Sequence, residues 1–250
     1  KRYSALYIGA NVLLTLFLTL LCGFLSHSVT AALLLILPLS ELTKGLLDYI
    51  ILLCVPPRRL PRLELGAGVP DEGRTICVIS ALLTDEDSGA RFAALLEEYY
   101  LANRDCGKNL LMGLLADLRE SDTETAPEDK SIISAAAEAI DRLNQKYGGG
   151  FYLFTRSRTL DDGRGKYSGF ERKRGALLEL AKLLCGQDSS LSTDSGDGTI
   201  LHSAHYILTL DSDTVPSPGS VSELIGAMLH PMNTPVLDRK HGLVTSGHGI

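Results

Sequence analysis

Two aspartates separated by one residue, Asp211 and Asp213, are the residues of this chain best suited to hold a metal ion. They follow the apolar run at 206–210, which predicts a buried strand, and precede a helix expected to start at Ser217 and Pro218, an N-cap and a first-turn proline. In open parallel sheets, ligands bind outside the carboxyl ends of strands. The pattern therefore predicts a Mg²⁺ or Mn²⁺ site that bridges the phosphates of a ligand.

A run of three cations, Arg172, Lys173 and Arg174, opens a helix predicted over residues 172–184. Positive charge at a helix amino terminus opposes the helix dipole. A bound anion would resolve this conflict, because backbone N–H groups and basic side chains both favour phosphate. We expect Lys173 to be the main phosphate contact and Arg172 the next. The alternative is a solvated basic turn.

Two further carboxylates follow earlier predicted strands. Asp117 follows a strand expected at 109–116, and Asp85 belongs to an acidic run at 84–87 that follows a strand expected at 75–82. Each could bond the ribose or base of a nucleoside at this edge of the sheet. Each could equally be an ordinary helix cap.

The positions of these residues depend on a body in which short apolar runs alternate with amphipathic ones. That alternation is typical of an α/β, Rossmann-like domain with a mostly parallel sheet. The domain is expected over residues 75–250, after a linker at 60–74 and a membrane anchor at 1–59. The expected strands lie at 75–82, 109–116, 151–154 and 206–210, the helices at 91–102, 131–147 and 172–184, and a flexible polar loop at 186–199. Gly148 to Gly150 should end the second helix.

The anchor prediction rests on two apolar runs. Residues 7–25 carry no charge and are long enough to cross a bilayer, which predicts a transmembrane helix rather than a signal peptide. Residues 29–55 include Glu41, Lys44 and Asp48, so this run is a second span that packs its polar face on other helices, or a span followed by an interfacial helix. Basic residues at both ends predict a multi-pass protein of the inner cell membrane with its body in the cytoplasm.

Charge and cysteine content agree with that placement. The formal net charge is -6, and the acidic residues concentrate in the body, which argues against nucleic acid as a partner. The five cysteines are widely spaced and odd in number, as expected of reduced thiols in the cytosol. His202 and His205 lack a third metal ligand nearby in sequence, so we expect them to be surface residues.

The order of these features resembles a known family. A helix led by Arg-Lys-Arg-Gly, followed by an apolar strand that ends in Asp-x-Asp, resembles processive membrane-bound glycosyltransferases with the GT-A fold, such as cellulose synthases. The closer resemblance is to the glycosyltransferase domain of cyclic β-1,2-glucan synthases (glycosyltransferase family 84, related to the processive family 2 transferases), over residues 33–250. It is carried by PPRRLPRLELGAGVP at 56–70, GFERKRGALLEL at 169–180 and YILTLDSDTVPSPGSVSELIGAMLHPMNTPVLD at 206–238.

This resemblance implies a GT-A-like fold, UDP-glucose as donor, a glucan acceptor, a lipid bilayer and a divalent metal. Asp211 and Asp213 would be the metal and diphosphate ligands, Lys173 the phosphate contact and Asp117 a nucleoside contact. Phe170 stands where the family usually has Trp. The chain ends at a strand edge without the family's acceptor segment, so we expect a piece of a longer protein. The catalytic base, a carboxylate, and a phosphorylase-like domain would lie beyond Ile250.

Two rival interpretations remain. A hydrophobic strand followed by Asp211-Ser212-Asp213-Thr214-Val215 also fits haloacid-dehalogenase-type phosphatases, in which Asp211 would form an aspartyl phosphate and Asp213 would be a general acid. That motif normally opens its domain, whereas here several α/β elements precede it. The other rival is a non-catalytic membrane scaffold with a transferase-like domain.

Overall fold

The computed structural model describes residues 2–56, 60–161, 163–238 and 243–246 of the chain, with side chains placed for the described residues from 3 to 234. The chain divides into two compact units, Lys1–Arg59 and Leu60–Ile250. Residues 1 and 57–59, which include basic flanks used in the orientation prediction, lie outside the described residues.

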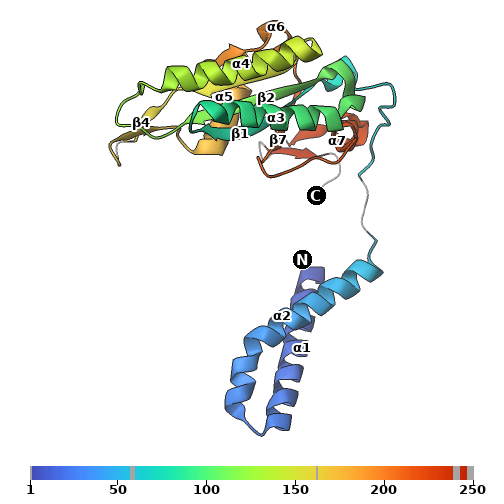
Figure 1. Cartoon of the computed structure of the whole chain (residues 1–250). Helices are drawn as coiled ribbons and strands as arrows, with labels where there is room; N and C mark the ends of the chain where they lie inside the picture. The colour runs from blue at the N-terminus through green and yellow to red at the C-terminus, as the bar shows by residue number, and fades with distance from the viewer. Residues whose placement is uncertain (1, 57–59, 162, 239–242, 247–250) are drawn as a thin grey trace. The chain divides into compact units, whose positions relative to one another are not determined.

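The first unit is a hairpin of two helices, α1 (Arg2–Ser26) and α2 (Val29–Cys54), which are blue in Figure 1. The connection turns at His27, and Ser28 caps α2 by accepting a hydrogen bond from the Ala31 amide at 3.3 Å. Both helices are long and apolar enough to cross a membrane, and few of their residues are buried inside the hairpin. The two predicted helices are confirmed, while their insertion into a membrane stays a prediction.

A line of polar contacts joins α1 to α2. The Tyr7 hydroxyl donates to Asp48 at 2.7 Å, the Thr43 hydroxyl donates to the Asn11 amide oxygen at 2.6 Å, and the hydroxyls of Thr15 and Thr43 lie 2.7 Å apart. The three α1 residues are spaced four apart, so they share one helix face. Polar groups of α2 thus find partners inside the hairpin, which lowers the cost of placing them among apolar residues.

The second unit is built on a five-stranded sheet with the order β6-β3-β2-β1-β7. Four strands run parallel, and the edge strand β6 pairs antiparallel with β3. The strands are β1 (Thr75–Leu83), β2 (Leu110–Leu118), β3 (Phe151–Arg156), β6 (Leu191–Ser195) and β7 (Tyr206–Leu210). This confirms the predicted mixed α/β architecture with a mostly parallel sheet.

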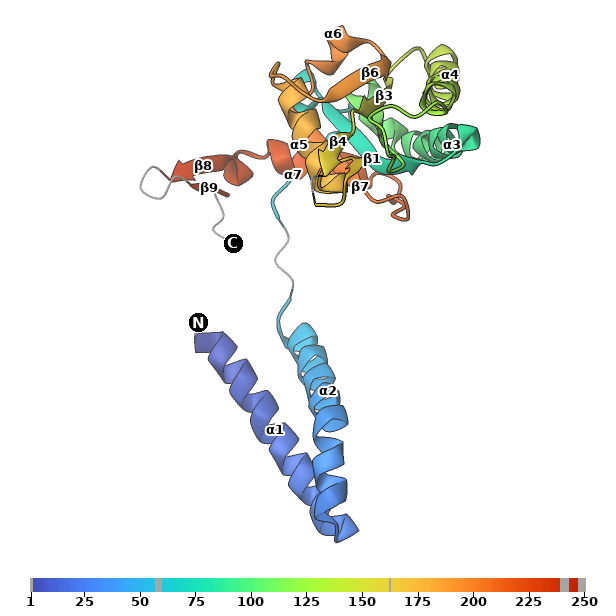
Figure 2. The same cartoon turned by 90° about the vertical axis from the view of Figure 1, so that its left-hand side faces the viewer.

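Helices cover both faces of this sheet, because alternate strand residues point to opposite sides. In Figure 2, α3 (Glu86–Ala102) and α4 (Asp129–Tyr147) lie on one side, and α5 (Arg172–Leu184) and α6 (Gly198–Leu201) lie on the other. The apolar cluster on the first side includes Leu96, Ile140 and Leu114, and α7 (Ser220–Leu229) adds Val221 to it. The cluster on the second side contains Leu180 of α5 together with strand residues.

The stop at the end of α4 was predicted correctly. Gly148 adopts a left-handed conformation with φ of 80°, which glycine reaches without strain. The amides of Gly148 and Gly149 both donate to the Asn144 carbonyl at 2.9 Å. The Asn144 side chain then bonds both the amide and the carbonyl of Phe151, which fixes the start of β3.

The prediction of a flexible loop at 186–199 was wrong. Residues 191–195 form β6 and residues 198–201 form α6. Leu191 is buried, and the β6 backbone pairs with β3, so sheet pairing overrides the low strand propensity of this polar segment. Asp197 caps α6 by accepting from the Thr199 amide at 2.8 Å.

The predicted start of α7 was also wrong. The N-cap is Gly219, with φ of 75°, and the helix begins at Ser220. Ser217 and Pro218 instead belong to a turn in which the Ser220 amide donates to the Ser217 carbonyl at 3.0 Å. The remaining elements are η1 (Asp71–Gly73), η2 (Arg104–Asn109), η3 (Pro231–Asn233) and the hairpins β4–β5 (Thr159–Asp161, Lys166–Ser168) and β8–β9 (Pro235–Asp238, Leu243–Ser246).

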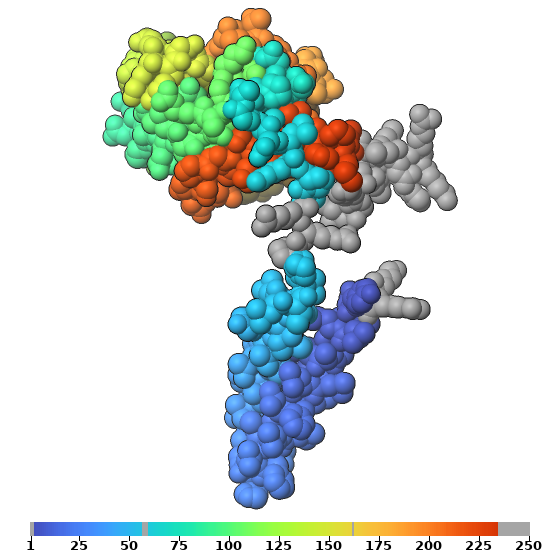
Figure 3. Space-filling view, turned by 90° about the vertical axis from the view of Figure 1, so that its right-hand side faces the viewer, coloured from blue at the N-terminus to red at the C-terminus, as the bar shows by residue number. Residues whose placement is uncertain are grey.

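Parts of the expected linker at 60–74 pack against the body. The Leu63 amide donates to the Gly226 carbonyl of α7 at 3.0 Å, and the Val69 amide donates to the Cys106 carbonyl at 3.1 Å. Val69 is buried, and its carbonyl accepts from the Asn109 side chain at 2.7 Å. In Figure 3 the cyan surface of this segment lies directly against the red surface around α7.

Candidate functional site

The carboxyl ends of the four parallel strands meet along one edge of the sheet. Leu82 of β1 is in register with Asp117 of β2, and Ile79 is in register with Leu210, the residue before Asp211. Asp85 is the second residue after the end of β1. The predicted site carboxylates therefore belong to the same edge of the sheet.

Lys173 and Asp211 form an ion pair at this edge. Lys173 lies in the first turn of α5 and Asp211 directly follows β7, 38 residues later in the sequence. The lysine side chain is 41% exposed and the aspartate side chain 63% exposed, so solvent or a ligand can reach both groups. The predicted phosphate contact and a predicted metal ligand thus lie in direct contact.

Asp213 is exposed on the same turn, in which the Thr214 amide donates to the Asp211 carbonyl at 3.0 Å. Within the described residues, no group of three or more His, Cys, Asp or Glu side chains could hold a metal ion. Two exposed carboxylates still fit Mg²⁺ or Mn²⁺ bound together with a phosphorylated ligand. Such ions commonly take one or two protein carboxylates and complete their shell with phosphate and water oxygens.

The strand before these aspartates is less buried than predicted. In β7, Thr209 is exposed and the other four residues are only half-buried. Among the described strands, β7 is an edge strand that pairs with β1 alone, so one of its sides lacks a neighbour. The strand prediction itself was correct at both ends.

Asp117 is the second-last residue of β2, and its side chain is buried against Arg156. The guanidinium donates from Nε to Asp117 Oδ1 and from Nη2 to Oδ2, both at 2.8 Å. Because β2 runs on to Leu118 and the next helix starts at Asp129, the helix-cap alternative for Asp117 is wrong. Its possible contact with a nucleoside stays a prediction.

The sequence reasoning missed Arg156. Its guanidinium also donates to the Phe170 carbonyl at 2.9 Å and to the Arg172 carbonyl at 3.1 Å, in the segment that leads into α5. One signal was available in the sequence, because two arginines, Arg156 and Arg158, closely follow the strand predicted at 151–154.

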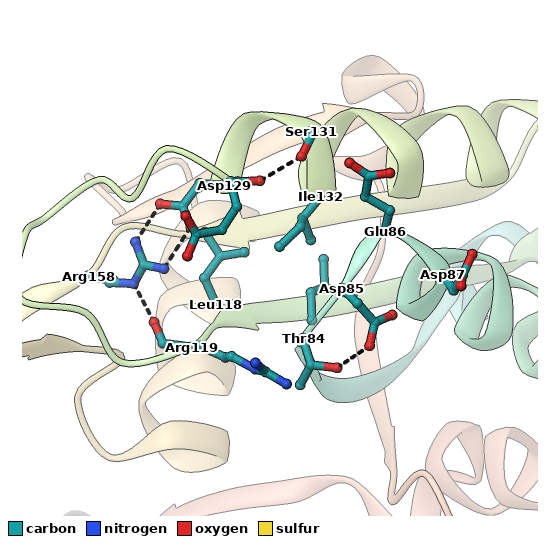
Figure 4. Close-up of a pocket in the computed structure, with 12 residues that line it drawn as sticks. Thr84, Asp85, Glu86, Asp87, Leu118, Arg119, Asp129, Ser131, Ile132 and Arg158 are labelled. Carbon is teal, nitrogen blue, oxygen red and sulfur yellow. Dashed lines mark hydrogen bonds and ion pairs between the residues drawn. The ribbon is translucent and has the colours of Figure 1, made fainter.

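Arg158 makes a second buried ion pair, with Asp129 at the start of α4. The two Nη–Oδ distances are 2.5 and 2.7 Å, and Figure 4 shows the two side chains facing each other. Hydrogen bonds from Arg158 hold the pKa of Asp129 below its ordinary value. Arg158 also donates to the Arg119 carbonyl at 2.6 Å, so it joins α4 to the segment after β2.

Asp85 lines the cavity of about 460 Å³ shown in Figure 4, together with Arg119, Asp129 and Arg158. Hydrogen bonds from the Thr84 and Ser88 hydroxyls lower the pKa of Asp85 to about 2. Asp85 takes the N-cap position of α3, which starts earlier than predicted, but its side chain makes no capping bond to the backbone.

A larger cavity of about 710 Å³ opens beside Asp117. Arg172 and Phe170 line it, as does the β4–β5 hairpin. The hairpin is held by paired backbone bonds between Ser121 and Tyr167 at 2.8 and 3.0 Å. Two predicted donor-binding residues, Asp117 and Arg172, therefore line one cavity.

The other candidate residues behave as expected. His202 and His205 are exposed, and all five cysteines are free. Burial raises the pKa of the Cys77 and Cys106 thiols to about 12, so neither is a ready nucleophile.

Comparison with known proteins bears on the meaning of this arrangement. No family model matches the chain. The chain is 32% identical, over an alignment of 254 positions, to the cyclic beta-(1,2)-glucan synthase NdvB of Rhizobium meliloti (strain 1021). It resembles a segment of a glucan synthase.

The aligned region covers 97% of this chain but only 9% of the length of that protein. The similarity supports the predicted likeness to cyclic β-1,2-glucan synthases and includes nearly all of the chain.

Proposed function

We propose that this chain is the donor-binding segment of a membrane-bound glycosyltransferase that moves glucose from UDP-glucose onto a growing β-1,2-glucan. The observation that carries the proposal is the contact between Lys173 and Asp211 at the carboxyl edge of a mostly parallel sheet. The similarity to a cyclic glucan synthase supports the reaction and the product class. A GT-A-like fold is part of the same proposal.

Each group at the edge has a role in holding the donor. Lys173 and Arg172 would bind the diphosphate, and Asp211 with Asp213 would hold Mg²⁺ or Mn²⁺. When bound, the cation offsets the negative charge that builds on the departing nucleoside diphosphate. Lys173 is kept at the site by Asp211 before the donor arrives, so its charge is already in place.

The nucleoside half would bind between the carboxylates at the ends of β1 and β2. Asp117 is buried and held in one orientation by two hydrogen bonds from Arg156. A carboxylate fixed in this way can accept a hydrogen bond from a base or ribose without losing side-chain freedom on binding. Asp85 would be the second contact, on the neighbouring strand.

The proposal places α1 and α2 in the inner cell membrane and the body in the cytoplasm, where nucleotide sugars are made. No observation favours the phosphatase or the scaffold, and the similarity to a glucan synthase argues for the transferase instead.

Calorimetry on the purified chain tests the ligand class. UDP, UDP-glucose and a plain phosphate ester are titrated with and without Mg²⁺ or Mn²⁺. We expect metal-dependent binding of UDP and UDP-glucose and much weaker binding of the ester. A folded chain that binds the ester as well as UDP, or binds no nucleotide at all, contradicts the proposal.

A further inference from the structure

We propose that Arg156 is the positioning residue of the donor site, an inference that rests on the proposed function. A single buried guanidinium bonds both Asp117, the proposed nucleoside contact, and the backbone segment that positions Lys173, the proposed phosphate contact. Arg156 would thereby fix the distance between the residues that bind the two halves of the donor.

The contacts of Arg156 divide between these two sides. Nε and Nη2 each donate to one oxygen of Asp117, which fixes the carboxylate at the end of β2. Nη1 donates to the Phe170 carbonyl and Nη2 also donates to the Arg172 carbonyl. Arg172 is the first residue of α5, so this last bond reaches the residue directly before Lys173.

Two glycines let the backbone close around the guanidinium. A Cβ added at Gly169 would lie 2.4 Å from Arg156 Nη2 and 2.8 Å from Asp117 Oδ1. A Cβ at Gly175 would lie 2.6 Å from Arg156 Nη1 and 2.1 Å from the Phe170 carbonyl oxygen. The glycine of the Arg-Lys-Arg-Gly sequence is therefore needed for this close approach.

The segment held by Arg156 is strained. Glu171 and Arg172 have φ values of 50° and 37°, which non-glycine residues rarely adopt, and no side chain caps α5 at its Glu171 N-cap. Backbone in this state persists only where its surroundings enforce it. The two carbonyl contacts from Arg156 supply that enforcement on either side of Glu171.

Only arginine fits this role. The side chains of Arg156 and Asp117 are 4% and 11% exposed, so the pair is largely shielded from water. The planar fork serves one carboxylate and two carbonyls together, whereas a lysine ammonium is a point charge that cannot reproduce the geometry. Arg156→Lys should therefore keep the charge and lose the positioning.

Arg158 provides a matched control. It is equally buried, makes a two-point contact with one carboxylate, Asp129, and donates to two carbonyls. Those carbonyls belong to Arg119 and Glu124, away from the start of α5. Arg158→Lys should cost similar stability without moving Lys173.

The test compares Arg156→Lys and Arg158→Lys in the whole chain, with Gly169→Ala as a second variant that displaces the guanidinium without removing it. UDP affinity is measured with Mn²⁺, and hydrogen exchange of the peptide spanning 169–175 is measured without nucleotide. We expect at least about a tenfold loss of UDP affinity, and faster exchange, in Arg156→Lys and Gly169→Ala. Arg158 lines the cavity beside Asp85, so Arg158→Lys should lose less UDP affinity than Arg156→Lys, and exchange of the 169–175 peptide should stay within about twofold of the unvaried chain.

Equal losses of affinity in the Arg156 and Arg158 variants would overturn the inference, because a general loss of stability would then explain both. Exchange at 169–175 that does not distinguish the two variants would overturn it as well. The exchange measurement needs no nucleotide, so it shows whether Arg156 restrains residues 169–175 even if the unvaried chain fails to bind UDP. That failure would instead overturn the proposed function.

Discussion

Asp129→Asn should destabilise the body by roughly 3–5 kcal/mol, because it leaves the Arg158 guanidinium buried without its counter-charge. Both residues are almost fully buried, and Asp129 accepts three hydrogen bonds, two from Arg158 and one from the Ala126 amide at 2.7 Å. The loss is set by the unpaired charge rather than by the number of contacts. Removing both charges, in Asp129→Asn with Arg158→Met, should therefore cost less than the two single changes summed, by roughly 1–3 kcal/mol.

Urea unfolding followed by thiol labelling measures these free energies within the intact chain. Cys77 and Cys106 are buried in the body, whereas Cys54 and Cys185 are exposed, so mass spectrometry of the first two reports opening of the body alone. Asp122→Asn breaks the exposed pair with Lys166 and should cost less than about 1 kcal/mol.

Acid provides a second check on the same pair. The pKa of Asp129 is lowered in the folded chain, so its stabilising contribution is present above the ordinary carboxyl pKa and is lost as the pH falls through the folded value. The difference in free energy of unfolding between the unvaried chain and Asp129→Asn should therefore shrink as the pH falls. Additive single changes, or a loss as small as that of Asp122→Asn, would refute the reasoning.

Two further predictions concern α5. Gly175→Ala should weaken UDP binding by about tenfold, because the added Cβ would lie 2.1 Å from the Phe170 carbonyl oxygen. Gly198→Ala is the control, since an added Cβ there has nothing within 4 Å, and it should leave UDP affinity unchanged. Calorimetry on both variants measures the affinities, and equal values would contradict the prediction. Hydrogen bonds from Lys182 and then the Ser190 amide lower the pKa of Glu179 from 4.5 to about 2. The difference in free energy of unfolding between the unvaried chain and Glu179→Gln should therefore vanish as the pH falls from 4.5 to about 2. Urea midpoints measure this difference, and a difference that does not change with pH would contradict the prediction.

The elements that were predicted well carry their signal locally. The strand at 206–210 is an apolar run stopped by Asp211, and α4 ends at a glycine that takes a left-handed conformation. Such features depend on neighbouring residues alone, so one sequence is enough to find them. The position of Asp211 directly after a parallel strand followed from the same apolar run.

The features that were missed depend on tertiary pairing. β6 is too polar to read as a strand, and it forms because β3 offers an unpaired edge. Arg156 and Asp117 are 39 residues apart, and the residues around each give no signal that the two side chains pair. The start of α7 was misplaced because a serine and a proline fit a turn as well as a helix amino terminus.

Electron paramagnetic resonance of Mn²⁺ tests the central claim most directly, because the free ion gives a signal that is lost on binding. The chain is titrated with Mn²⁺ with and without UDP, and compared with Asp211→Asn, Asp213→Asn and, as control, Asp188→Asn at an exposed position beyond the far end of α5. The account predicts UDP-dependent binding of the ion that is lost in the first two variants and kept in the third. Binding that survives both Asp211→Asn and Asp213→Asn, or that ignores UDP, would contradict the assignment of this edge of the sheet as a nucleotide-sugar site.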